Sequence, residues 1–227
     1  MITSASNQRL KLVRRLASRR QRERLGLFVA EGEDLVEAAV AAGLEPVELL
    51  VAGETVAPEL LASVSTLPHP ARVIGVFRRA DLPGFEARPV GLALWHLGDP
   101  GNVGTLVRCA DAFGAFVTLS AGCADPTAPR ALRASAGAVF RVPIGRFDEA
   151  RGRRVGLVAH GGTALSDVEL HEGTTFVVGA EREGLPGEVA GRCDELATIP
   201  LEAGAESLNA AVAGAIALYE WRRRAAA

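Results

Sequence analysis

Short apolar runs alternate with stretches of helical periodicity through the second half of the chain. Five apolar runs have the length of a strand, at residues 90–95, 116–120, 155–159, 176–180 and 196–200. They carry apolar residues at consecutive positions, which is typical of strands buried on both faces of a parallel sheet covered by helices. Helical stretches lie at residues 103–113 and 207–224. The pattern predicts an α/β fold for this part of the chain.

The first 80 residues form a separate block. A short strand and a helix closed by Gly43 are predicted over residues 28–43, and two further runs of strand length lie at residues 47–52 and 72–77. The segment that follows holds two prolines and one glycine between ordered patterns, which is typical of a linker. We therefore expect a small α/β domain over residues 1–80, a linker over residues 81–89 and a second domain over residues 90–227.

Basic residues are concentrated near the start of the chain. Residues 9–24 contain eight basic residues and one acidic residue, and Leu10, Val13 and Leu16 recur at helical spacing. The spacing predicts one amphipathic basic helix over these residues, with the leucines and valine packed inward. The basic side chains that fall on one stripe of this helix are Lys11, Arg15, Arg19 and Arg22. The stripe is suited to binding phosphates, and the alternative is a merely solvated face.

Composition limits where a nucleic acid or a metal could bind. The 25 Lys and Arg residues oppose 27 Asp and Glu residues, and the net charge of −2 excludes a uniformly basic protein that coats nucleic acid. The three cysteines form no C-x-x-C pair, so we predict neither a disulfide framework nor a metal site. The first residues lack a basic head followed by an apolar core, and the longest apolar run, Ala210 to Leu218, is too short to cross a bilayer. We expect a cytoplasmic protein without a membrane segment.

Three loops after predicted strands hold the candidate chemistry, because ligands of open α/β sheets bind at the carboxyl ends of strands. The loop at residues 97–104 contains Asn102, which could be the N-cap of the next helix. Arg108 lies two turns into that helix, opposite its apolar positions, so it faces solvent or a ligand. The loop at residues 179–187 has three glycines, which let a ligand approach the backbone. Its spacing fits neither a P-loop nor a dinucleotide fingerprint.

The third loop, residues 199–209, leads into the last helix. Ser207 is a natural N-cap for that helix. Asn209 would then lie inside its first turn, although Asn is a poor helix former and a buried amide needs hydrogen-bond partners. The helix itself is apolar on nearly every face until Glu220, which predicts burial in this chain or against a second copy.

Together the three loops resemble the three sequence motifs of the SpoU, or TrmH-like, RNA ribose 2′-O-methyltransferases. The segments that carry the resemblance are DPGNVGTLVRCADAFGA, VVGAEREGLP and IPLEAGAESLNAAVAGAIALYE. Residues 2–39 are similar to the N-terminal RNA-binding domain of that family, so the resemblance covers most of the chain. It implies a SPOUT-type parallel sheet with a C-terminal deep trefoil knot, an exception to the rule that chains do not knot.

The resemblance also implies that S-adenosylmethionine is the cofactor and that the knot holds it. The implied cofactor-binding residues are Gly179, Gly184, Ile199, Leu201 and Leu208. The implied catalytic set is Arg108, Asn102, Glu181, Ser207 and Asn209. Arg108 would bind the phosphate beside the reacting ribose, and a buried Glu181 would pair with it. Because proteins keep Arg protonated, we expect Arg108 to position and stabilise first, with direct proton abstraction left open.

RNA and a second copy of the chain are the partners that the resemblance implies. The homodimer would form through the last helix, and the basic stripe would bind RNA phosphates. We predict S-adenosylmethionine-dependent 2′-O-methylation of a ribose in structured RNA, with 23S-type ribosomal RNA favoured over tRNA. Two other classes stay open. The first is a knotted RNA-binding or assembly protein with little methyl transfer, and the second is a small-molecule methyltransferase.

Overall fold

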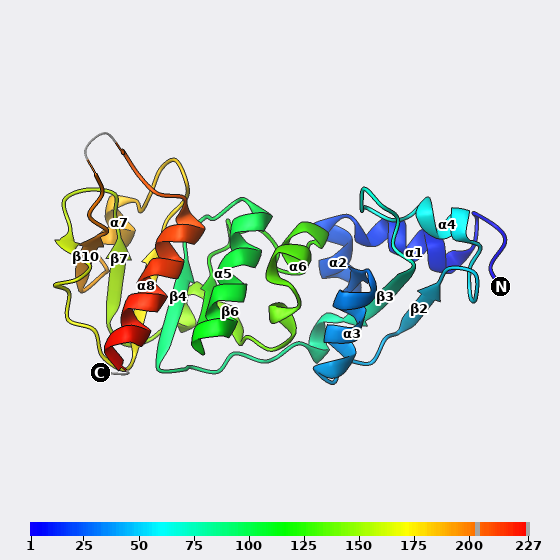
Figure 1. Ribbon diagram of the computed structural model, residues 1–227, viewed down its shortest axis with the longest axis horizontal. Coiled ribbons are helices and arrows are strands. Elements are labelled where there is room, and N and C mark those ends of the chain that lie inside the picture. The colour runs from blue at the N-terminus through cyan, green and yellow to red at the C-terminus, as the bar shows by residue number, and fades with distance from the viewer. Residues whose placement is uncertain (203–204, 226–227) are drawn as a thin grey trace.

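The computed structural model describes residues 1–202 and 205–225, and it is an elongated α/β arrangement with the two ends of the chain far apart (Figure 1). Within these ranges, seven parallel strands form the larger sheet in the order β6-β5-β4-β9-β7-β10-β8. Their bounds are β4 Val90–Leu94, β5 Phe116–Leu119, β6 Ile144–Arg146, β7 Arg154–Leu157, β8 Thr163–Ala164, β9 Thr174–Val178 and β10 Glu195–Thr198. The predicted parallel sheet is confirmed, and all five predicted runs lie in it.

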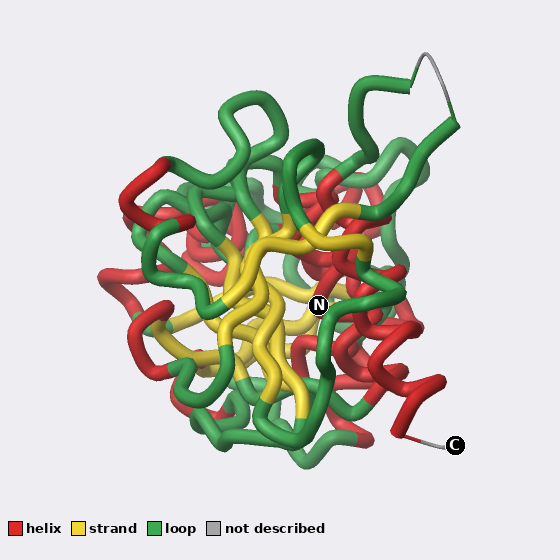
Figure 2. The backbone as a smooth tube through the Cα atoms, turned by 90° about the vertical axis from the view of Figure 1, so that its left-hand side faces the viewer, coloured by secondary structure: helices red, strands yellow, loops and turns green. Residues whose placement is uncertain are grey.

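Helices cover both faces of this sheet (Figure 2). Leu92 and Leu94 of β4 pack in one cluster with α5 (Pro100–Phe113) and α8 (Ala210–Ala225), whereas Ala93 between them belongs to a cluster on the α7 (Gly187–Ala190) side. Successive side chains of a strand point to opposite faces, so a strand covered on both sides must be apolar throughout. This explains why the runs in the sequence do not alternate with polar residues.

The first 80 residues form a second, smaller sheet. In the described chain it has the order β1-β3-β2, with antiparallel pairing, and comprises β1 Leu27–Glu31, β2 Glu48–Val51 and β3 Val73–Arg78. Its helices are α1 Gln8–Leu16, α2 Arg19–Leu25, α3 Glu33–Ala41 and α4 Pro58–Ala62. Residues 82–89 form neither helix nor strand and connect this sheet to β4. None of the helices in the described ranges is long and apolar enough to cross a membrane.

The prediction of one basic helix over residues 9–24 is wrong, because α1 ends at Leu16 and α2 begins at Arg19. Leu10, Val13 and Leu16 are buried, as their spacing predicted. The Arg22 guanidinium stabilises the break, since its Nη1 donates to the carbonyl oxygens of Leu16 and Ala17 at the end of α1, both at 2.9 Å. Helical periodicity does not report a side chain of one helix that donates hydrogen bonds to the last carbonyl groups of the helix before it.

The position of Arg22 on an exposed stripe is also wrong. Arg22 is 3% exposed, and its Nε contacts Asp125 Oδ2 of the second unit at 2.8 Å. Arg79 Nη1 contacts both oxygens of the same carboxylate at 3.2 Å, and Thr127 donates to it through its backbone N and its hydroxyl. Arg22 is therefore occupied at the junction between the two sheets and is not available to an RNA phosphate.

Apolar packing continues across the same junction. The ring of Phe28 in β1 stacks on Phe77 of β3 at 5.8 Å and on Phe140 of the second unit at 6.0 Å between ring centroids. All three rings are almost fully buried and belong to one cluster that runs from the small sheet to the large one. The two units thus share a core, which fixes the direction in which the basic α1 points relative to the larger sheet.

Replacing Asp125 with Asn should destabilise the protein by about 3–5 kcal/mol at pH 7, because Arg22 would stay buried without its counter-charge. Burial alone would raise the pKa of Asp125, but Arg79, Thr127 and Arg22 together hold it below its ordinary value. A lowered folded-state pKa adds stability above the unfolded-state pKa of about 3.9, and this is lost as the pH falls through the folded-state value. The stability difference between wild type and variant, measured by urea unfolding, should therefore be constant near pH 7 and narrow progressively as the pH falls below about 4. A difference that stays constant in acid would contradict the ion-pair account.

Candidate active site

The first loop places Asn102 at the carboxyl end of β4, in the first turn of α5. Asp99 is the N-cap of this helix, and its Oδ1 accepts from the Asn102 backbone N at 2.9 Å. The alternative of Asn102 as the N-cap is therefore wrong. Its side chain is left free to contact other loops. The helix closes at Gly114, which has the left-handed conformation expected of a C-cap glycine.

The Asn102 amide joins the three loops. Its Nδ2 donates to Glu181 Oε1 of the second loop at 2.7 Å, and its Oδ1 accepts from Asn209 Nδ2 of the third loop at 3.1 Å. The nitrogen and the oxygen of one side chain thus each form a hydrogen bond, the first to a residue 79 positions away and the second to a residue 107 positions away. The three loops singled out in the sequence meet at one edge of the sheet.

Asn209 is the cap of the last helix rather than a member of its first turn. Its Oδ1 accepts from the backbone N of Ala211 at 2.9 Å and of Val212 at 3.3 Å, and α8 begins at Ala210. The prediction that Ser207 caps this helix is wrong, because the chain turns into the helix two residues later. Residues 203–204 of the third loop lie outside the described residues.

A cavity of about 380 Å³ opens between the second and third loops, within the size range of small-molecule sites. All five residues predicted to bind the cofactor line it: Gly179, Gly184, Ile199, Leu201 and Leu208. Glu181 and Ser207 of the predicted catalytic set line it as well. The remaining wall is mostly aliphatic, from Leu157, Val178, Leu185, Ala197 and Ala213. Backbone groups that can form hydrogen bonds, together with aliphatic side chains for apolar contact, fit an adenosine-containing ligand that is bound without a metal ion.

Gly179 is required by the close approach of the loop to itself. A Cβ at this position would meet the backbone of Gly184 and lie 2.6 Å from the Leu185 backbone N. Gly184 has φ +64°, the left-handed conformation that favours glycine. The Ala180 to Gly184 turn that these glycines permit is closed by a hydrogen bond from Gly184 N to Ala180 O at 2.9 Å.

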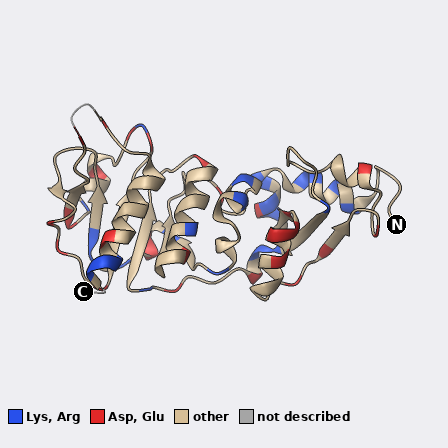
Figure 3. Ribbon diagram, in the orientation of Figure 1, with Lys and Arg blue, Asp and Glu red and all other residues tan. Residues whose placement is uncertain are grey.

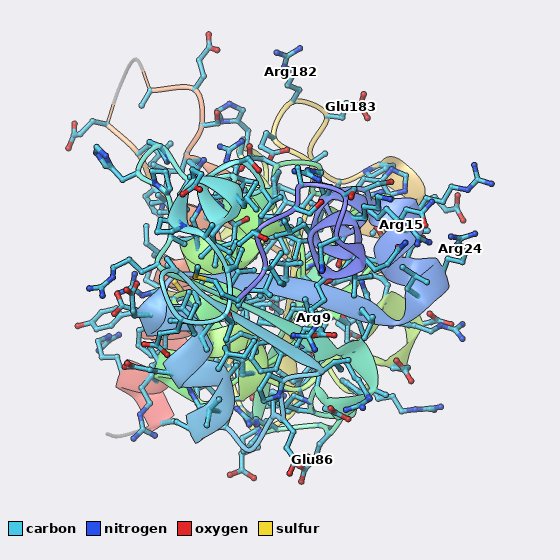
Figure 4. The ribbon with its side chains drawn as sticks, turned by 90° about the vertical axis from the view of Figure 1, so that its right-hand side faces the viewer. Arg9, Arg15, Arg24, Glu86, Arg182 and Glu183 are labelled. Atoms are coloured by element: carbon cyan, nitrogen blue, oxygen red, sulfur yellow. The ribbon has the colours of Figure 1, made fainter. Side chains whose placement is uncertain are left out.

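A second, more open groove of about 670 Å³ adjoins this cavity and shares residues 180–183 with it. Its other lining residues are His96, Gly98, Asp99, Asn102, Gly122, Arg130 and Asn209. Figure 4 shows Arg182 and Glu183 projecting outward from the shared loop. Arg130, at the start of α6 (Pro129–Ser135), contacts Asp99 Oδ2 at 3.0 Å and is largely exposed. No sequence motif marks Arg130 or His96, and the fold alone brings them to the groove.

Arg108 does not join this site within its own chain. It is exposed, lines neither the cavity nor the groove, and has no hydrogen bond or ion pair with residues 1–202 or 205–225. Helix geometry places it about 9 Å along α5 from Asn102 and about 240° around the axis. Within one chain, Arg108 does not pair with Glu181, which is exposed and whose carboxylate accepts from Asn102.

Basic side chains gather on α1, α2 and α6 (Figure 3). Lys11 and Arg15 are exposed on α1, and Figure 4 shows Arg15 projecting away from the protein. Arg19 is exposed as well, but it contacts Glu23 at 2.8 Å and donates from Nη1 to the Cys123 carbonyl oxygen at 2.9 Å. Of the four predicted phosphate-binding residues, Lys11 and Arg15 are thus the most accessible.

In the described ranges, no three His, Cys, Asp or Glu side chains lie close enough to hold a metal ion. The cysteines are free thiols, and burial raises the pKa of Cys109 and of Cys193. The thiolate fraction of both is therefore reduced at neutral pH, and neither group lines the cavity or the groove.

Comparison with known families decides how the three joined loops are classified. The model of the SpoU rRNA Methylase family matches residues 89–219, which include all three loops. The chain belongs to the SpoU rRNA methylase family. A second model, described as an MRM3-like substrate binding domain, matches residues 7–80. The resemblance seen in the sequence is confirmed.

Several relatives match over nearly the whole length of both chains, so the similarity covers both units. The 23S rRNA (guanosine(2553)-2′-O)-methyltransferase RlmP of Bacillus subtilis is 31% identical, over 97% of this chain and 98% of that protein. The AdoMet-bound rRNA methyltransferase from Sinorhizobium meliloti superposes with a TM-score of 0.88 at 29% identity, over 98% of this chain and 97% of that one. The AdoMet complex of the SpoU methyltransferase AviRb from Streptomyces viridochromogenes gives a TM-score of 0.86 at 27% identity, over 97% and 99%.

Proposed function

We propose that this protein transfers a methyl group from S-adenosylmethionine to a ribose 2′-hydroxyl of ribosomal RNA. The observation that carries the proposal is the meeting of the three SpoU loops at Asn102, beside a cavity of cofactor size. Two relatives of the same overall structure, an rRNA methyltransferase and a SpoU methyltransferase, were solved with AdoMet bound, and a relative matched over nearly its whole length is named as a 23S rRNA 2′-O-methyltransferase.

The cavity offers the cofactor two kinds of contact, apolar packing from its wall and hydrogen bonds from its loop backbone. Ile199, Leu201 and Leu208 would pack against the adenosine and methionine portions, while the backbone of residues 179–184 supplies hydrogen-bonding groups at close range. The bound cofactor supplies an activated methyl on a sulfonium. The protein then has to align a 2′-hydroxyl with that methyl and manage one proton. Asn102, Glu181 and Asn209 line the adjoining groove, where they would orient the ribose.

In a homodimer, the Arg108 of one protomer would reach the active site of the other. In its own chain Arg108 lies on an exposed face of α5, away from the cavity. The neighbouring helix α8 carries two exposed apolar residues, Val212 at 46% and Tyr219 at 57% exposure, and Tyr219 packs edge-on against Phe113 of α5. A second copy seated on this face would cover the apolar side chains and bring Arg108 beside the groove. There Arg108 would bind the adjacent phosphate and stabilise developing negative charge.

The first unit would deliver the RNA. It matches a substrate-binding family model, and its junction with the larger sheet is buried and ion-paired. Lys11, Arg15 and Arg19 would contact phosphates of folded RNA, and the groove-lining Arg130 would extend this path toward the active site. We propose that residues 1–80 and 90–227 are the two functional units and that residues 81–89 link them. We also propose a cytoplasmic location and the family's trefoil knot. The knot is supported by the loops after β9 and β10, which line one cavity.

A knotted RNA-binding or assembly protein with little methyl transfer is the second candidate. It is favoured by the absence of Arg108 from the cavity of its own chain, which leaves a single protomer without its proposed catalyst.

Replacing Gly179 with Ala should weaken S-adenosylmethionine binding by about tenfold or more, since overpacking a tight contact costs about 1–3 kcal/mol. Isothermal titration of the purified dimer measures the effect. Gly187→Ala is the matched control, because a Cβ there meets no atom within 4 Å. Equal affinity of both variants and wild type would show that the cofactor binds elsewhere.

Replacing Arg108 with Ala should lower methyl transfer by about a hundredfold or more, with S-adenosylmethionine binding unchanged, because the side chain lies outside the cavity. Transfer of tritiated methyl groups to ribosomal RNA measures the rate. If wild type and variant transfer equally little label while both bind RNA, the binding-protein candidate replaces the methyltransferase.

A mixed dimer tests whether Arg108 acts across the interface. Arg108→Ala and Gly179→Ala chains, co-expressed with different tags, purified as a heterodimer and assayed with S-adenosylmethionine well below the Kd of the Gly179→Ala variant, should regain up to about half of the wild-type rate. One of the two symmetric sites would then have an intact cavity and a partner arginine. A heterodimer as inactive as either variant homodimer would place Arg108 in the site of its own chain.

A further inference from the structure

His96 has an unusual backbone conformation at the carboxyl end of β4. Its φ is +50°, and among the described residues other than glycine only His96 and Ala136 have a positive φ. This region favours glycine, because a Cβ crowds the neighbouring backbone there. A residue keeps such a strained conformation only when surrounding contacts hold it there, and such residues cluster at functional sites.

Two contacts hold His96 in place, and Gly122 leaves room for its ring. Its backbone N donates to Ser120 Oγ at 2.8 Å. Its ring stacks on Trp95 with 4.7 Å between centroids and 8° between planes, and Trp95 itself packs edge-on against Phe147. A Cβ at Gly122 would lie only 2.7 Å from the ring Cγ, so the glycine leaves the space that the imidazole needs.

The His96 ring, held in this way, lines the open groove. Asn102, Glu181 and Asn209 line the same groove, where the reacting ribose would lie under the proposed function. The ring nitrogens make no hydrogen bond to any residue in the described ranges, whereas the backbone N does. Trp95 covers one face of the ring and Gly122 adjoins the ring as well, so the contact that the ring offers a nucleotide is hydrogen bonding through its nitrogens.

We propose that His96 determines specificity by hydrogen-bonding the base of the nucleotide whose ribose is methylated. The proposal rests on the proposed function, because it needs the target nucleotide in the groove. A hydrogen bond to a base edge distinguishes bases, whereas the arginines on α1 and α6 contact the shared phosphate backbone. Without His96 the enzyme should still bind and methylate RNA, but with less preference for the correct base.

The test compares wild type with His96→Gly and His96→Asn. Both residues tolerate a positive φ, so the backbone is preserved while the imidazole is lost. Ala136→Gly is the matched control, since it relieves the same conformation at φ +48° on an exposed residue outside the groove. The substrates are four RNAs, each carrying the mapped target site with a different base at the methylated nucleotide. The readout is kcat/KM for each RNA, together with KM for S-adenosylmethionine.

Wild type and Ala136→Gly should prefer one base, and both His96 variants should lose about three- to tenfold of that preference, the effect expected for a single hydrogen bond. KM for S-adenosylmethionine should stay the same, because His96 does not line the cofactor cavity. Unchanged base preference in both His96 variants overturns the proposal. A purely structural ring would lower all four rates alike, which also overturns it. If wild type transfers no methyl to any RNA, the proposed function itself fails.

Discussion

The arrangement of this protein depends on one amide side chain that satisfies both of its polar atoms across the sheet edge. Asn102 donates to Glu181 and accepts from Asn209, while Asp99 fixes its backbone and Asn209 fixes the start of α8. Each bond alone is worth only about 1 kcal/mol. Their effect is geometric: two loops that are far apart in sequence are held at a distance that leaves a cavity between them. Removing either oxygen or nitrogen of the amide would disconnect one loop from the other two.

A second constraint lies at the junction between the sheets. Asp125 is surrounded by Arg22, Arg79 and Thr127, and the stacked rings beside it continue the apolar core. An ion pair buried in this way adds little net stability compared with apolar packing, but it penalises any arrangement that separates its members. The junction therefore keeps the exposed basic face of α1 in a fixed direction. If the basic face of α1 binds RNA under the proposed function, its fixed distance and direction from the groove would allow only one position of a folded RNA to reach the groove.

The sequence predicted the parts of this structure that depend on local pattern. Strands buried on both faces appear as continuous apolar runs, and loop motifs at their ends identified the residues that line the cavity. Features set by distant contacts were missed. Arg22 resembles any exposed basic residue until Asp125, 103 positions away, is placed beside it. Ser207 has the residue type of an N-cap, and only the hydrogen bonds of Asn209 to the start of α8 show that Asn209 caps the helix instead. His96 and Arg130 reach the groove from segments without a motif, so no local signal could have marked them.

Mapping of ribose methylation is the most direct test of the central claim that the joined loops form a methyl-transfer site. Ribosomal RNA from cells that lack the gene would be incubated with the purified protein and S-adenosylmethionine, and 2′-O-methyl groups would be mapped along it. The account predicts one new methylated ribose that appears only when protein and cofactor are both present, and that is found in RNA from wild-type cells. An RNA that binds the protein but gains no methyl group at any position would contradict it.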